Sequence, residues 1–185
     1  MQPDTNVRTI LRTATARHHQ RVDDSFSAFT LSDRVSYCRF LRAQAAAHLP
    51  VEEALETGGI GSIVADWAAR RRNEYLLLDL SELELDVPAA VGTPVLNKPA
   101  ALLGALYVLE GSRLGGTLLR RQVAHGLPTR FLDRSDSAAW RELLAQLDIE
   151  LNTALKRETA IKAAGDVFDL FHLSAQLASA PGSAS

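Results

Sequence analysis

Two short stretches of the sequence carry residue types that could do chemistry. The first contains the adjacent histidines His18 and His19, with Asp23 four residues after the second. The other, "YVLEGSRLGG" over residues 107–116, holds three glycines inside what otherwise reads as a long helix. Imidazole nitrogens bind metals and exchange protons near neutral pH. Glycines let another molecule approach a helix backbone closely, because no Cβ stands in the way.

The glycines allow two interpretations. Gly111 and Gly115 are four residues apart and share one helix face, with Gly116 beside them. Each glycine in a helix interior costs roughly 1 kcal/mol against alanine, so the segment needs a structural reason to contain three. One reason is a neighbouring helix packed tightly on a patch of small residues. The other is a flat ligand lying against the helix, where a local bend would expose backbone groups to it.

A flat ligand with a metal centre would need an axial group from the opposite wall. The chain has five histidines that could supply one: His18, His19, His48, His125 and His172. Helical periodicity places His18 nearer the middle of the apolar side of the first predicted helix, and His19 toward its edge. Periodicity therefore favours His18 as the more buried residue, but it does not decide which histidine binds a metal.

The elements that must position these residues are helical. Apolar residues recur mostly at helical spacing and alternating strand patterns are scarce, which predicts an all-α class. We expect the first helix to begin near Asp4 or Thr5 and to stop before Thr30. We expect the glycine helix to be capped by Asn97 and to run to Gly126.

The rest of the chain supplies the body of the bundle. Ser32 or Asp33 can cap a second helix, and Pro50 can start a short third one. The prolines and glycine of residues 86–98 predict the main irregular connection, and the arginine run 69–72 is interpreted as a solvated helix face. We expect one domain over residues 1–178 and a disordered tail over 179–185. Five segments have the helical pattern: 31–49, 50–59, 62–80, 135–151 and 156–177.

Composition narrows the class of function. The formal net charge of -2 and the pI of about 6.2 give no overall positive charge that would recruit nucleic acid or an acidic membrane surface. No apolar run approaches the roughly 18 residues of a membrane span. The single cysteine, Cys38, excludes an intramolecular disulfide and suits a reducing compartment, which predicts a cytoplasmic protein.

The two stretches together resemble a known family. "LRTATARHHQRVDDSF" and "GALYVLEGSRLGG" are similar to the bacterial, biliverdin-producing heme oxygenases, particularly the group associated with bacteriophytochromes. In that family the proximal helix carries a characteristic pattern. A leucine and a basic residue are followed by a threonine, a histidine comes four residues after the threonine, and an acidic residue comes four residues after the histidine. The resemblance selects His19 as the proximal iron ligand, with His18 as its competitor. Five residues match this pattern: Leu11, Arg12, Thr15, His19 and Asp23.

The second stretch resembles the family's distal helix, whose glycines let the backbone lie close over heme. The resemblance assigns catalysis and heme contact to Gly111, Ser112 and Gly115, and heme contact to Gly116. Animal-type members have an aspartate where this chain has Ser112, and that aspartate organises the water that delivers protons. Ser112 with ordered water is the candidate substitute here. The implied fold is a multi-helix bundle with heme between the proximal and distal helices.

Heme is a flat apolar disc with two carboxylates at one edge, so its pocket must be dry on the faces and basic at the rim. Arg12 stands where the family has a residue that contacts a propionate. Tyr107 and Arg141 are further candidates for this rim. "AAGDVFDLF" is similar to the family's last helix and puts Phe168 in the pocket wall. Asp23 either orients His19 through its second ring nitrogen or pairs with an arginine on its own helix.

The resemblance implies a heme oxygenase, which cleaves heme to biliverdin, carbon monoxide and ferrous iron with dioxygen and external electrons. Heme would be both cofactor and substrate. The sequence has no dinucleotide fingerprint and no cluster-binding cysteines, so a ferredoxin or flavin reductase is the implied donor. A bacteriophytochrome is the implied recipient of biliverdin. Two alternatives remain open: a heme carrier or sensor that does not degrade heme, and a helical interaction protein whose glycines only pack helices.

Overall fold

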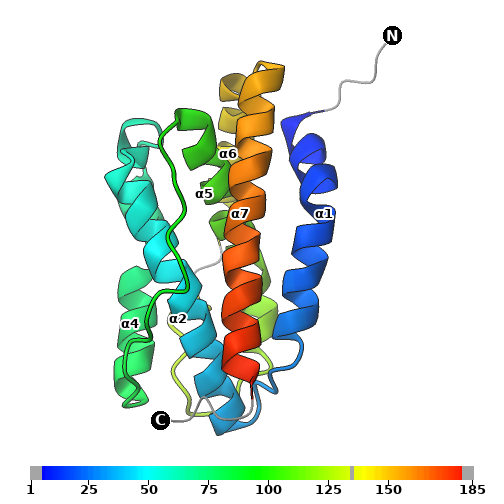
Figure 1. Ribbon diagram of the computed structural model, residues 1–185. Coiled ribbons are helices and arrows are strands. Elements are labelled where there is room, and N and C mark those ends of the chain that lie inside the picture. The colour runs from blue at the N-terminus through cyan, green and yellow to red at the C-terminus, as the bar shows by residue number, and fades with distance from the viewer. Residues whose placement is uncertain (1–5, 134–135, 181–185) are drawn as a thin grey trace.

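The computed structural model describes residues 6–133 and 136–180, and all regular elements within them are helical. The predicted all-α class is therefore confirmed. Figure 1 shows the helices as a bundle around α7. The elements in chain order are α1 (Val7–Phe26), α2 (Arg34–Thr57), η1 (Ile60–Ser62), α3 (Trp67–Arg70), α4 (Asn73–Glu82), α5 (Pro99–Arg120), α6 (Ser137–Glu150) and α7 (Ala154–Ser179).

The long helix α7 lies at the centre of the bundle and packs against α1, α2 and α5. Its contact with α5 is close because Gly104 has no side chain, and a Cβ at this position would overlap the carbonyl oxygen of Ala160. The contact is entirely apolar around this point, with Ala105, Ala160 and Ala164 fully buried. Tight packing of small residues thus fixes α5 on the central helix.

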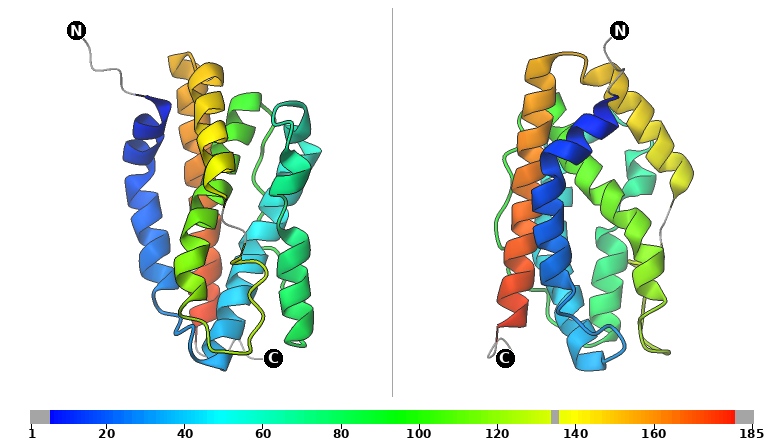
Figure 2. Two further views of the ribbon diagram at one scale, coloured as in Figure 1. Left: turned by 180° about the vertical axis from the view of Figure 1, so that it is seen from behind. Right: turned by 90° about the vertical axis from the view of Figure 1, so that its right-hand side faces the viewer.

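Helices α1 and α5 both rest on α7, but within the described residues they barely touch each other. The right-hand view of Figure 2 shows α1 in front of α5, with α7 on one side and α6 on the other. Helix α6 contacts both α1 and α5. These four helices therefore surround the space between α1 and α5.

The prediction of a helix break at Pro50 is wrong, because α2 continues through this residue to Thr57. Proline lacks the N–H that would bond the carbonyl of Ala46, four residues earlier. The N–H of Val91, in the irregular segment before α5, donates to that carbonyl instead at 3.1 Å. Val51 and Leu55 continue the buried face of the helix on the far side of the proline. The freed carbonyl is thereby satisfied, so the helix need not end.

The prediction of one helix over residues 62–80 is also wrong, because α3 and α4 are separated at residues 71–72. The break is stabilised by Glu52 on α2, whose carboxylate accepts the backbone N–H groups of Arg72 at 2.7 Å and Asn73 at 3.0 Å. A carboxylate that accepts the first free N–H groups of α4 acts as a cap from another helix. The sequence around the break contains no sign of it.

The arginine run is not a solvated helix face. Arg70 and Arg72 are buried, at 4% and 3% exposure, and Arg71 alone of the three points outward, where it pairs with Glu56. Arginines are rarely buried without partners. Both buried arginines find theirs on α5, where Arg70 pairs with Glu110.

The ends of α1 and α5 differ from their predicted positions. Asp4 and Thr5, the expected caps of the first helix, lie outside the described residues, and Asn6 caps α1 by accepting the N–H of Thr9. Helix α5 begins after Lys98 and ends at Arg120. After the helix ends, the chain reaches the segment between α1 and α2, where the N–H of Ala124 donates to the carbonyl of Leu31.

Helix α7 reaches two residues beyond its predicted end and includes Ser179. The predicted disordered tail begins at that serine, and its last five residues lie outside the described ones. The irregular connection expected over 86–98 is present between α4 and α5. In the described part of the chain, the helices all lack the length or apolar character needed to cross a bilayer.

Candidate functional site

A cavity of about 1110 Å³ lies between α1 and α5. Small-molecule pockets are typically about 300–1000 Å³, so this one suits a large ligand. One wall is α1 and the opposite wall is the glycine face of α5. Five phenylalanines supply flat apolar surface around the cavity: Phe26, Phe29, Phe40, Phe131 and Phe168.

His19 lines the cavity from the α1 wall. Its Nδ1 lies 2.9 Å from Oδ2 of Asp23, one turn further along the helix. Phe168 of α7 meets the imidazole edge-on, with ring centroids 5.6 Å apart. In a neutral ring, an Nδ1–H that donates to a carboxylate leaves the lone pair on Nε2, and this is the nitrogen that can bind a metal. The sequence left open whether Asp23 pairs with His19 or with an arginine on its own helix. In the structure its carboxylate contacts His19.

His18 points to another part of the molecule. Its Nδ1 lies 3.0 Å from Oδ1 of Asp169 on α7, and its ring stands 3.4 Å from where a Cβ on Gly165 would be. The His18 side chain is 35% exposed against 61% for His19, so periodicity ranked the burial of the pair correctly. The burial of His18, however, is against α7. Of the two histidines, the structure brings His19 to the cavity.

The glycines of α5 divide into two kinds. A Cβ on Gly115 would meet no atom of the described chain within 4 Å, and one on Gly111 would meet only Trp140, at 3.8 Å. A Cβ on Gly116 would instead lie 2.8 Å from the carbonyl oxygen of Leu132. All three line the cavity. Helix packing therefore explains Gly116, whereas Gly115 presents bare backbone to open space and Gly111 meets only the edge of the Trp140 ring.

One end of the cavity is basic. Arg12 lines it as predicted, and Arg8, one turn earlier on α1, joins it. Both guanidinium groups act on Tyr107 across the cavity: burial raises the pKa of the phenol, and the two positive charges partly offset this rise. The phenol stays protonated at neutral pH and can donate a hydrogen bond. Arg8 was not predicted, although its four-residue spacing from Arg12 places both on one helix face.

Two other predicted site residues, Thr15 and Arg141, lie in different environments. Thr15 lines the cavity, but its hydroxyl donates to the carbonyl of Leu11 at 2.8 Å. Arg141 is exposed on α6 and is not among the residues that line the cavity. Its neighbour Trp140 lines the cavity instead. The structure thus brings together all the predicted site residues except Arg141.

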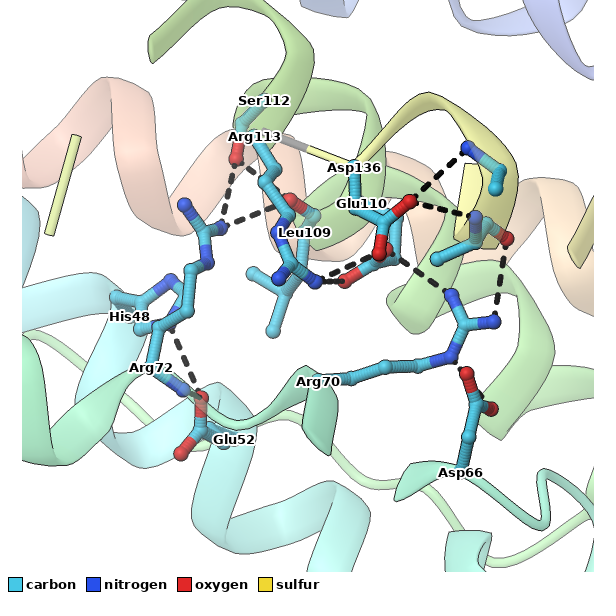
Figure 3. Close-up of polar contacts among 12 residues, drawn as sticks. His48, Glu52, Asp66, Arg70, Arg72, Leu109, Glu110, Ser112, Arg113 and Asp136 are labelled. Carbon is cyan, nitrogen blue, oxygen red and sulfur yellow. Dashed lines mark hydrogen bonds and ion pairs between the residues drawn. The ribbon is translucent and has the colours of Figure 1, made fainter. Parts of the chain in front are cut away.

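Arg72 is a cavity residue that the sequence did not reveal. Its Nη2 donates to the carbonyl of Leu109 at 2.9 Å and to the hydroxyl of Ser112 at 3.2 Å (Figure 3). The ring of Phe131 lies 4.7 Å from the guanidinium carbon. Burial lowers the pKa of Arg72 to about 10, so the side chain keeps its charge at neutral pH. Ser112 in turn donates to the carbonyl of Leu109 at 2.8 Å.

The segment that carries Arg72 is held from behind by Glu52 and His48 of α2 (Figure 3). His48 Nε2 lies 3.2 Å from Oε2 of Glu52. Burial lowers the pKa of His48 to about 4, so its ring is neutral at pH 7. Burial acts to raise the pKa of Glu52, but the hydrogen bonds from His48, Arg72 and Asn73 together hold it below its ordinary value. Glu52 is therefore a carboxylate that fixes the backbone at Arg72.

An imidazole that faces bare helix backbone across an apolar cavity with one basic end defines a class of protein. It is an all-α protein built to hold a flat, metal-centred ligand with acidic groups at one edge. No family model matches the chain.

The chain is 35% identical over 147 residues to a protein named heme oxygenase from Xanthomonas campestris pv. campestris, covering 76% of this chain and 88% of the relative. It is 29% identical over 174 residues to "Heme oxygenase PigA" of Pseudomonas aeruginosa, covering 87% of each. The fold matches the NO- and CO-bound heme oxygenase from Neisseria meningitidis with a TM-score of 0.76 and 18% identity, over 97% of this chain and 95% of that one. The chain belongs to the heme oxygenase family, as its two motifs predicted.

Proposed function

We propose that this chain is a heme oxygenase that binds one heme between α1 and α5 and cleaves it to biliverdin, carbon monoxide and ferrous iron. Dioxygen and external electrons complete the reaction, and heme is both cofactor and substrate. One observation carries the proposal. His19 and the bare face of Gly111 and Gly115 stand on opposite walls of the same cavity.

The residues around the cavity fit heme. His19 offers a ring nitrogen on one wall, and its Asp23 partner strengthens the ring as a ligand. Gly115 leaves open the space that a side chain would take from a flat ring. Arg8 and Arg12 suit the two propionates, and each charge-assisted hydrogen bond of this kind contributes about 1.5–3 kcal/mol.

Bound heme supplies the redox centre at which dioxygen is activated. The residues of the chain supply position and protons. Asp23 fixes the orientation of the His19 ring, and the phenylalanines keep bulk water from the faces of the macrocycle. Ser112 occupies the position to which the family resemblance assigns proton delivery. Arg72 donates a hydrogen bond to the Ser112 hydroxyl and orients it. A fixed positive charge beside that hydroxyl also stabilises negative charge that develops on the same side.

The electrons come from outside the chain. We infer a ferredoxin or a flavin reductase as the donor and a bacteriophytochrome as the recipient of biliverdin. The absence of a dinucleotide fingerprint and of cluster-binding cysteines in the sequence supports an external donor. The similarity of the two motifs to the phytochrome-associated group supports the recipient. The lone Cys38 supports a cytoplasmic setting.

Hemin titration followed by reduction tests the proposed function. We expect a Soret shift that saturates at one hemin per chain. Addition of ascorbate or a ferredoxin system in air, with catalase present to remove free peroxide, should then bleach this band while biliverdin absorption rises and carbon monoxide is released. A Soret band that persists under these conditions would identify a carrier or sensor. Absence of any Soret shift would identify a helical interaction protein.

Replacement of Arg72 by methionine should slow heme degradation while leaving heme bound. The variant keeps apolar bulk at a buried site but loses both hydrogen bonds to α5. Removal of one donor that acts directly on the reacting group typically slows catalysis 100-fold or more. Because Arg72 acts through Ser112, we expect about a tenfold decrease in the single-turnover rate and little change in hemin affinity.

Arg71→Met is the matched control for this prediction. Arg71 is adjacent in sequence and of the same type, but it is exposed and pairs with Glu56. Its replacement should change neither the turnover rate nor the affinity for hemin. Melting temperatures of both variants separate a loss of stability from a loss of rate. An Arg72→Met protein that turns over at the unaltered rate would show that the guanidinium serves packing alone.

A further inference from the structure

Trp140 of α6 covers part of the cavity face of α5. Its ring stacks on Tyr107, with centroids 5.5 Å apart and planes inclined by 35°. Its Cη2 lies 3.8 Å from where a Cβ on Gly111 would be. Tyr107, Gly111 and Gly115 follow at intervals of four residues, so they form one stripe along the helix. The indole therefore covers the first two positions of this stripe and leaves Gly115 open.

The backbone next to the indole is held by a group of charges, of which Arg70 and Glu110 are buried. Arg70, whose side chain is 3% exposed, donates from Nη2 to the carbonyl of Ala139, the residue before Trp140, at 3.1 Å. Its Nη1 lies 3.0 Å from Oε2 of Glu110, the residue before Gly111 (Figure 3). The guanidinium of Arg70 thus links the backbone next to Trp140 to the side chain next to Gly111.

Two more ion pairs fix this guanidinium and its carboxylate. Asp66 accepts from Nε of Arg70 at 2.8 Å, and Arg113 donates to Oε1 of Glu110 at 3.1 Å. Arg70 and Glu110 are both buried, and separating them would leave a charge desolvated without a partner. These contacts therefore hold the backbone that carries Trp140 against α5, and its indole forms part of the cavity wall.

We propose that Trp140 is a specificity-determining residue, which closes the Tyr107 end of the space along α5 and confines dioxygen to the part over Gly115. This inference rests on the proposed function. With the basic residues Arg8 and Arg12 also near Tyr107, the covered part of the stripe lies at the propionate end of the cavity. The edge of the macrocycle at that end is then closed to attack, which excludes the biliverdin isomer that cleavage at this edge would give.

Three variants test the wall. Trp140→Ala opens the covered space, Trp140→Leu opens it while keeping apolar bulk for folding, and Trp140→Phe is the matched control that keeps a flat ring. Circular dichroism melting and a saturable Soret shift establish that each variant folds and binds hemin. We expect chromatography of the alanine and leucine products to show an additional biliverdin isomer that the wild type and the phenylalanine variant do not form.

A second readout does not depend on turnover. Carbon monoxide rebinding to the ferrous heme complex after flash photolysis should become several-fold faster in the alanine and leucine variants, because the ligand has more space to enter. An unchanged set of isomers and unchanged rebinding in a folded Trp140→Leu protein would overturn the proposal. If the wild type binds hemin but does not degrade it, the proposed function fails, and the rebinding rates still decide whether Trp140 limits the distal space.

Discussion

Replacement of His19 by alanine should abolish heme degradation, whereas replacement of His18 should leave heme degradation unchanged. His19 lines the cavity with Nδ1 engaged by Asp23, so Nε2 is the nitrogen left for iron. His18 is bound to Asp169 on α7 and cannot serve the cavity without leaving that partner. We expect His19→Ala to lose the Soret and ferrous-CO spectra of a histidine-ligated heme and to show no turnover above background.

His18→Ala is the matched control, since it removes the adjacent imidazole from the same helix. It should keep the wild-type spectrum and rate and lose only some stability. Added imidazole provides a second control, because it can occupy the space left in His19→Ala and restore the spectrum of a histidine-ligated heme. If His18→Ala loses the spectrum and His19→Ala keeps it, the ligand assignment must move to His18.

The two histidines show what sequence periodicity could and could not predict. The pattern ranked His18 as the more buried residue, and it is. Burial and access to the cavity are different properties, however, because α1 contacts α7 with one face and lines the cavity with the next. A hydrophobic pattern describes which face is covered by protein. It does not describe a face that is kept free for a ligand, so only the resemblance favoured His19.

Helix type and most helix positions were predictable because they depend on local spacing, caps and prolines. The errors occur where a distant residue satisfies a backbone group. Val91 bonds the carbonyl freed by Pro50, and Glu52 caps α4. In both cases the partner lies 20 or more residues away in the chain, where a local pattern contains no trace of it.

Arg72 and Trp140 were missed for the same reason. Arg72 lies in an arginine run that reads as a solvated surface, and its burial depends on α5, which supplies the carbonyl of Leu109. The position of Trp140 over Gly111 depends on how α6 is held against α5. Side chains that shape the cavity from other helices become visible only when the helices are assembled.

The glycines illustrate the same limit within one helix. Gly104 was not singled out, yet it is the glycine whose replacement would clash most severely with α7. Gly116 is also a packing residue, against the backbone of Leu132. Gly115 has the same residue type and the same helical backbone but open space in front of it, and Gly111 faces only the Trp140 ring. Helix packing and an open face for a ligand therefore both occur in this glycine segment, at different residues. Substitution of individual glycines can distinguish the two roles.

Gly115→Leu should prevent heme binding without lowering stability. A Cβ at this position meets no atom of the described chain within 4 Å, so the leucine side chain extends into the cavity and takes the space of the ligand. Replacement of a helical glycine by leucine also raises helix propensity, by up to about 1 kcal/mol. We expect a melting temperature equal to or above that of the wild type, and a hemin titration without a saturable Soret shift.

Gly104→Ala is the contrasting variant, since its single added carbon would overlap the carbonyl of Ala160 and force α5 away from α7. It should lower the melting temperature strongly, although Gly104 does not line the cavity. Gly115→Ala should bind hemin more weakly than the wild type and remain as stable. If Gly115→Leu binds hemin with unaltered affinity, the ligand does not lie against α5. If it unfolds instead, Gly115 is a packing residue like Gly104, and the bare face of the helix has been misassigned.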